Sequence, residues 1–149
     1  MALYFLETSA LVKLYVQEEG TERLLQIALP SAGNQLAILS IAQVEFHSAV
    51  RRRTRDGDID EAVAAQVLGS FDADAVSRFI TQAADEVVID LACGLLANYP
   101  LRAYDAIQLA GCLALRSIAP EPPVFSCADH RLLEAAENEG LTCMDPASR

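Results

Sequence analysis

Four carboxylate residues stand within or directly after apolar segments rather than in polar runs. They are Glu7, Glu45, Asp105 and Asp129. A carboxylate is rarely buried without a partner, because losing its hydration costs several kcal/mol or more. The sequence places no Lys or Arg where it would pair with all four of them. A hard divalent cation bound by carboxylate oxygens would account for the whole set.

The segments that must position these residues alternate between strand and helix patterns. We predict strands over residues 3–6, 36–39, 124–126 and 141–144, whereas residues 87–89 fit either a short strand or the start of a helix. Helices are predicted after Thr8 and after Ser40, each as an N-cap, and over 20–29, 59–80, both sides of Pro100 and 129–139. This alternation predicts a single α/β domain over residues 1–149, with a parallel sheet covered on both faces.

Ligands of such sheets lie beyond the carboxyl ends of the strands, and Glu7 and Asp129 each follow a predicted strand. Glu45 lies on a helix where its neighbours are small or apolar, so its side chain is expected to point inward. Asp105 begins a helix. Simpler alternatives remain open: Asp105 and Asp129 also suit helix N-termini, and Glu45 also suits a partner such as Arg102 or a hydroxyl group.

Other kinds of chemistry find little support in the sequence. The phosphate-binding motifs G-x-x-x-x-G-K-[ST] and G-x-G-x-x-G are absent, as is the G-x-S-x-G nucleophile elbow. His47 and His130 have no H-E-x-x-H context. The four cysteines are widely spaced, which favours reduced, small hydrophobic residues over a zinc site: Cys93, Cys112, Cys127 and Cys143.

Composition and charge narrow the class of protein further. The 149 residues are 52% hydrophobic, which predicts a globular domain with a sizeable core. No apolar run approaches the ~20 residues of a membrane span, and the N-terminus does not resemble a signal peptide, so we expect a cytoplasmic protein. The net charge of −10 argues against non-specific nucleic-acid binding. One basic cluster, Arg51–Arg53 with Arg55, fits a helix C-terminus, a phosphate contact or a partner site.

Four motifs in order along the chain resemble those of the PIN domain family. Residues 3–15 resemble its opening strand and Asp-Thr-Ser-Ala-Leu motif, and residues 40–45 its second motif. Residues 101–110 are close to the third motif, and residues 125–133 match the fourth, Ser/Thr-x-Asp-x-x-Leu. One departure stands out: Glu7 occupies the position at which the family normally has Asp.

The resemblance implies a PIN-like three-layer α/β/α sandwich with a central parallel sheet. It also implies a ribonuclease that depends on Mg²⁺ or Mn²⁺, and small members of this kind are similar to the toxins of VapBC-type toxin–antitoxin pairs. An RNA substrate, a cognate antitoxin and a homodimer are expected on the same ground. The side chain of Glu7 is one methylene longer than that of Asp, which would change the position of its oxygens around a metal. This matters because Mg²⁺ demands near-ideal octahedral coordination.

We therefore expect Glu7, Glu45, Asp105 and Asp129 to form one acidic, metal-binding catalytic pocket. Glu7 and Asp105 are the preferred direct ligands, Asp129 a ligand or water-positioning group, and Glu45 a ligand of a second metal or a holder of the attacking water. Thr8 and Ser9 would supply hydroxyls near the scissile phosphate or brace Glu7. The alternative is a catalytically weak PIN-fold binding module for a protein partner or RNA. A metal-dependent phosphatase or DNA nuclease is a third, weaker alternative.

Overall fold

The structure, a computed structural model, describes residues 1–148. Its centre is a five-stranded sheet in the order β3-β2-β1-β4-β5, and every neighbouring pair is parallel. The strands are β1 (Leu3–Leu6), β2 (Gln35–Leu39), β3 (Ile80–Gln82), β4 (Val124–Ser126) and β5 (Thr142–Met144).

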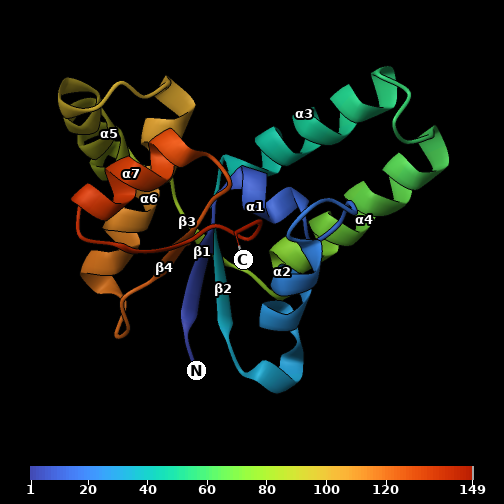
Figure 1. Cartoon of the computed structure of the whole chain (residues 1–149), viewed down its shortest axis with the longest axis horizontal. Coiled ribbons are helices and arrows are strands. Elements are labelled where there is room, and N and C mark those ends of the chain that lie inside the picture. Colours follow the sequence, from blue (N-terminus) through green and yellow to red (C-terminus); the bar gives the residue numbers. More distant parts are fainter. Residues whose placement is uncertain (149) are drawn as a thin grey trace.

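Helices cover both faces of this sheet, which confirms the predicted α/β/α sandwich (Figure 1). One face carries α5 (Glu86–Asn98), α6 (Ala103–Ile118) and α7 (His130–Asn138). The other carries α1 (Thr8–Val12), α2 (Thr21–Ala28), α3 (Ala42–Arg55) and α4 (Glu61–Ser77). A short 3₁₀ helix, η1 (Pro30–Ala32), leads into β2. None of the helices within residues 1–148 is long and apolar enough to cross a bilayer.

Alternation along the strands divides the interior into two cores. Leu3 and Phe5 of β1 pack toward α5, α6 and α7, whereas Leu6 packs toward α1 to α4. In β2, Leu39 faces the first of these cores and Ile38 the second. Successive side chains of a strand point to opposite faces, so a sheet covered on both sides needs apolar residues at nearly every position. The apolar runs of the sequence meet this need.

The region between residues 59 and 87 differs from the sequence prediction. The helix predicted over 59–80 ends at Ser77, and residues 80–82 form the edge strand β3. This strand has only three residues and none of them is buried, so it leaves no alternating pattern in the sequence. Residues 87–89 belong to helix α5, which Asp85 caps by accepting a hydrogen bond from the Val88 amide at 3.1 Å.

Helix α6 approaches the sheet closely because it carries a glycine at the contact. A Cβ atom at Gly111 would lie 2.6 Å from Cδ1 of Leu39 in β2. The absence of that atom lets the helix backbone pack directly on the strand. Most of α6 is therefore buried, and its first two turns are held over the carboxyl ends of the strands.

Candidate active site

The site lies at the edge of the sheet where β1 and β4 end. Leu6 pairs with Ser126 across these two parallel strands, and the Glu7 amide donates to the Ser126 carbonyl at 3.0 Å. Glu7 and Asp129 each follow one of the two strands. Parallel strands end on the same side of a sheet, so the topology brings together two residues that are 122 positions apart in the sequence (129 minus 7).

Glu7 caps helix α1, although the sequence pointed to Thr8 as the N-cap. Glu7 has an extended backbone, and its Oε2 accepts hydrogen bonds from the Ser9 amide at 3.0 Å and from the Ser9 hydroxyl. Thr8 is instead the first helical residue, which frees its hydroxyl for another contact. Burial raises the pKa of the Glu7 carboxyl above its ordinary value, the bonds from Ser9 oppose this rise, and the charge of Glu45 adds to it.

The Ser9 hydroxyl links helix α1 to the loop between β4 and α7. It donates to Glu7 and accepts a hydrogen bond from the Ala128 amide at 3.0 Å. In the same loop, the buried Cys127 sulfur accepts from the Asp129 amide at 3.2 Å. Ser9 and Cys127 thus hold the backbone segments that carry Glu7 and Asp129. Cys127 was expected to be a structural cysteine, and these contacts give it a positioning role that its spacing did not predict.

Glu45, Thr8 and Gln108 form a closed hydrogen-bond triangle across three helices. Oε1 of Glu45 accepts from Nε2 of Gln108 at 2.7 Å and from the Thr8 hydroxyl at 3.2 Å. The same Gln108 nitrogen also donates to the Thr8 oxygen at 3.0 Å. Both donors approach Oε1, so Oε2 is the oxygen that remains available to a ligand. Burial raises the pKa of Glu45, the two donors oppose the rise, and the charge of Asp105 adds to it.

Gln108 was not among the site residues predicted from the sequence. Gln108 is fully buried, and its Oε1 has no hydrogen-bond partner among the described residues. The sequence did contain one signal: the polar side chain of Gln108 interrupts an apolar run that includes Ala106, Leu109 and Ala110. A buried polar side chain needs a partner, and here the partner is the Glu45 carboxylate.

Asp105 and Asp129 complete the acidic group from the first turn of α6 and the cap of α7. Burial raises the pKa of Asp105, the neighbouring charge of Asp129 adds to the rise, and Arg102 opposes it. The Arg102 Nε atom lies 3.6 Å from Oδ2 of Asp105 but is largely exposed, so this ion pair is weak. Asp129 caps α7 through Oδ1, which accepts from the Leu132 amide at 3.1 Å. The helix-terminus alternative therefore describes part of what Asp129 does.

The negative charges of these carboxylates raise the pKa values of their neighbours, one after another across the site. Glu45 raises the pKa of Glu7, Asp105 that of Glu45, and Asp129 that of Asp105. Like charges held together in this way favour a bound cation, and oxygen donors suit Mg²⁺ or Mn²⁺. Within residues 1–148, however, no three His, Cys, Asp or Glu side chains converge closely enough to form a ready-made metal site. The donor set fits a hard cation in its chemistry but is not closed around a single point.

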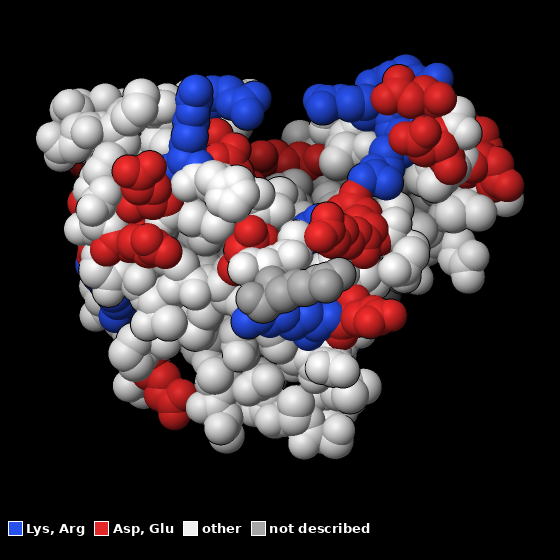
Figure 2. All heavy atoms as spheres, viewed as in Figure 1, with Lys and Arg blue, Asp and Glu red and all other residues white. Residues whose placement is uncertain are grey.

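A pocket of about 520 Å³ opens beside this group. Its lining includes Glu7, Thr8, Ser9, Glu45, Arg52 and Tyr104. Figure 2 shows a hollow between the body of the molecule and the projecting α3–α4 pair, with Asp and Glu side chains inside it and Lys and Arg on both rims. Asp105 and Asp129 do not line the pocket itself. The pocket therefore gives a ligand access to the Glu7 and Glu45 side of the group.

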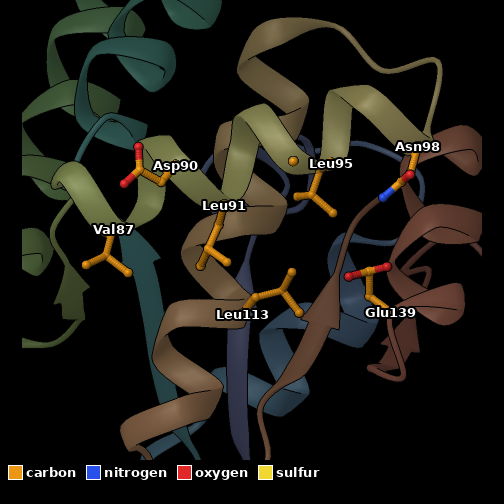
Figure 3. A pocket seen from close by; sticks show the side chains of 8 residues that line it. Val87, Asp90, Leu91, Leu95, Asn98, Leu113 and Glu139 are labelled. Atoms are coloured by element: carbon orange, nitrogen blue, oxygen red, sulfur yellow. The ribbon is translucent and has the colours of Figure 1, made fainter.

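A second pocket, of about 460 Å³, lies between α5 and α6 on the opposite face of the sheet (Figure 3). Leu91 and Leu95 point from α5 toward Leu113 of α6, and Asp90 and Glu139 lie at its margin. The Tyr99 hydroxyl donates to Glu139 at 2.6 Å. These side chains form an apolar groove without a nucleophile or an assembled group of acids, so the candidate active site is the first pocket.

Comparison with known proteins identifies the family. The profile of the PIN domain family matches residues 4–138. No curated protein matched the chain. Among solved structures, FitAcB from Neisseria gonorrhoeae matches with a TM-score of 0.65 at 12% identity, covering 96% of this chain and 97% of that one.

VapBC2 from Rickettsia felis, bound to a DNA fragment from its promoter, matches with a TM-score of 0.64 at 14% identity, covering 95% of this chain and 97% of that one. FitAB bound to an IR36 DNA fragment matches with a TM-score of 0.66 at 12% identity, covering 98% and 96% respectively. These identities are low, so the likeness concerns the fold. Together with the match over residues 4–138, the fold confirms the resemblance inferred from the four motifs: the chain belongs to the PIN domain family.

Proposed function

We propose that this protein is a metal-dependent endoribonuclease and the toxin of a toxin–antitoxin pair. The proposal depends on four neighbouring carboxylates, Glu7, Glu45, Asp105 and Asp129, beyond the carboxyl ends of the strands. Gln108 and Thr8 hold Glu45 in place by hydrogen bonds. Membership of the PIN domain family supports nuclease chemistry. The structural likeness to chains of the VapBC2 and FitAB assemblies supports an antitoxin partner. A homodimer and a cytoplasmic location belong to the same proposal.

In this proposal each residue has a separate task. Glu45 offers Oε2 to the metal or to its bound water, because Oε1 is already occupied by Gln108 and Thr8. Asp105 and Asp129 supply further oxygen ligands, and Glu7 supplies the remaining carboxylate while Ser9 braces it. A bound Mg²⁺ or Mn²⁺ would lower the pKa of its water and stabilise charge on the phosphodiester. The protein itself orients the carboxylates. Its pocket gives the RNA substrate access to Glu7 and Glu45.

A catalytically weak binding module is the second candidate, and two observations favour it. Glu7 is only 6% exposed, and its Oε2 is occupied by Ser9. The carboxylates also do not form a closed three-ligand cluster within residues 1–148. A protein of this kind would hold RNA or a protein partner on the same surface without cleaving it.

Cleavage of a mixed single-stranded RNA pool by the purified chain, with Mn²⁺ or with EDTA, tests the first candidate against the second. We expect cleavage with Mn²⁺ that is lost with EDTA. Glu45→Gln should abolish it, because the amide keeps an acceptor for Gln108 and Thr8 but removes the charge. The matched control is Asp90→Asn, which neutralises an exposed carboxylate on α5 outside the site. RNA that is bound but left intact by a folded protein would favour the binding module instead.

A further inference from the structure

We propose that the pocket beside the carboxylates is a nucleotide subsite in which Tyr104 stacks on a base of single-stranded RNA and Arg52 contacts a neighbouring phosphate. The inference rests on the proposed function, because it assumes that RNA is the substrate. It adds the class of ligand and the two residues that would select it.

Tyr104 is the exposed aromatic residue of the chain. Its exposed fraction is 66%, whereas every other Tyr and Phe is buried or half-buried. It stands immediately before Asp105 in the first turn of α6 and lines the pocket together with Glu7 and Glu45. Its hydroxyl makes no hydrogen bond with another residue of the described chain. An aromatic ring left in water beside an acidic site serves neither the core nor a polar network, but it does suit a nucleobase.

Arg52 differs from the basic residues on either side of it. Arg51 pairs with Glu61 at 3.4 Å, and Arg53 pairs with Glu18. Arg52 is exposed and has no ion-pair partner within residues 1–148, yet it lines the same pocket as Tyr104. The cation is therefore available to a ligand.

The spacing along α3 places Arg52 at a useful distance from the reaction centre. Glu45 and Arg52 are seven residues apart, so they lie on the same face of the helix, about 10 Å apart along its axis. At that separation the guanidinium reaches a phosphate beside the one that approaches the carboxylates. Val44 and Ala49 add apolar surface to the wall of the same pocket. A cation, an aromatic face and an apolar wall together suit one nucleotide of a single strand.

Arg52 supplies beside the pocket the positive charge that RNA requires and that the chain as a whole lacks. The chain carries a net charge of −10, and the pocket has two carboxylates in its wall. A polyanion approaching such a surface needs a local cation at each phosphate that it brings close. An unpaired arginine beside an exposed aromatic residue meets this need and also gives contact to the base, which a basic patch alone would not.

The test is the affinity of short fluorescein-labelled RNA for variants of the full chain. All variants carry Asp105→Asn and are measured in Mg²⁺, so that the RNA stays intact. The probes are oligoadenylate and an oligomer of the same length whose residues are abasic. Tyr104→Leu should weaken oligoadenylate binding about tenfold and leave the abasic oligomer unaffected. Tyr104→Phe, which keeps the ring, should bind like the parent.

Arg52→Ala should weaken both probes by a similar factor, because the phosphates are common to them. The slope of log Kd against log salt should become shallower by about 0.7, as expected for the loss of one contact to a single strand. Arg51→Ala is the matched control, because Arg51 already pairs with an exposed carboxylate and does not line the pocket. It should change neither the affinity nor the slope.

The outcomes separate this inference from the proposed function. If the parent binds oligoadenylate and the native chain cleaves RNA, but Tyr104→Leu and Arg52→Ala bind as the parent does, the subsite is overturned and the nuclease stands. This is also the result expected if a protein partner occupies the pocket. If the parent binds no RNA and the native chain cleaves none, the proposed function fails and the subsite fails with it.

Discussion

The side-chain amide of Gln108 donates to Oε1 of Glu45 at 2.7 Å and thereby joins helix α6 to helix α3 within the acidic group. The same amide bonds to Thr8, so one buried residue orients groups from two other helices. Because hydrogen bonds hold Oε1 of Glu45 in place, its second oxygen, Oε2, points in a defined direction. This relationship makes Gln108 a positioning residue for the proposed catalysis.

Gln108→Leu should reduce cleavage strongly while changing stability little. The substitution removes two hydrogen bonds, of which the bond to a charged group is worth about 1.5–3 kcal/mol. It also removes a buried Oε1 that has no partner in the described chain, a defect of about 1–3 kcal/mol. The two effects oppose each other, and their central values leave a fall in the free energy of unfolding of about 1 kcal/mol. Urea unfolding and cleavage assays measure the two quantities separately.

Gln43→Leu, at an exposed position of α3, is the control for adding an apolar side chain near the site. A further readout comes from metal binding, because a freed Glu45 should lower the rise in melting temperature that Mn²⁺ produces. If Gln108→Leu cleaves and responds to Mn²⁺ like the native protein, the amide has no positioning role.

Asp105→Asn should stabilise the metal-free protein, and by more at pH 8 than at pH 5. Burial and Asp129 raise the pKa of Asp105 in the native state. The native state therefore binds more protons than the unfolded state between the two pKa values, and stability falls as pH rises through that window. Asparagine removes this penalty, and the exposed pair with Arg102 contributes little against it. Melting curves of both proteins in EDTA across this pH range measure the difference, and a gap that narrows as pH rises would contradict the charge argument.

Mn²⁺ should raise the melting temperature of the native chain at neutral pH. An ion that binds only the native state at a hundred times its Kd stabilises by about 2.7 kcal/mol. For a chain of this length, that corresponds to about 5–10 °C. The effect should weaken below about pH 5, where the carboxylates become protonated and stop acting as ligands. The control Asp90→Asn should retain the full rise in melting temperature, and Glu45→Gln should lose most of it. A native chain whose melting temperature does not respond to Mn²⁺ between pH 6 and 8 would favour the binding module.

Glu7→Asp should keep or raise cleavage under Mg²⁺, and Glu7→Ala should nearly abolish it. Asp is the residue that the PIN family usually has at this position, and it is also a good N-cap, so helix α1 should keep its cap. Glu7→Ala loses both the carboxylate and the bonds from Ser9, at a stability cost of about 1 kcal/mol. Cleavage rates in Mg²⁺ and in Mn²⁺ for the three proteins decide the matter. Equal cleavage by Glu7→Ala and the native chain would remove Glu7 from the site.

The sequence determined the layers of the fold, because they follow from local pattern. Apolar runs such as Leu3–Leu6 and Val124–Ser126, separated by helical periodicity, demand a parallel sheet with two covered faces. Parallel strands end on one edge, so the sequence also placed Glu7 and Asp129 near each other. The three-residue strand Ile80–Gln82 escaped prediction because it is too short and too exposed to leave a periodic signal.

Only the tertiary structure decided which side chains meet. Thr8 looked like a helix cap, but its hydroxyl bonds to Glu45, 37 residues away in the sequence. Gln108 looked like an ordinary residue of an apolar helix until the packing of α6 placed its amide against Glu45. Arg52 stood in a run of similar arginines, and within residues 1–148 Glu61 and Glu18 pair with its two neighbours but not with Arg52 itself. Such contacts depend on the distance through space between segments remote in sequence, and local periodicity does not encode that distance.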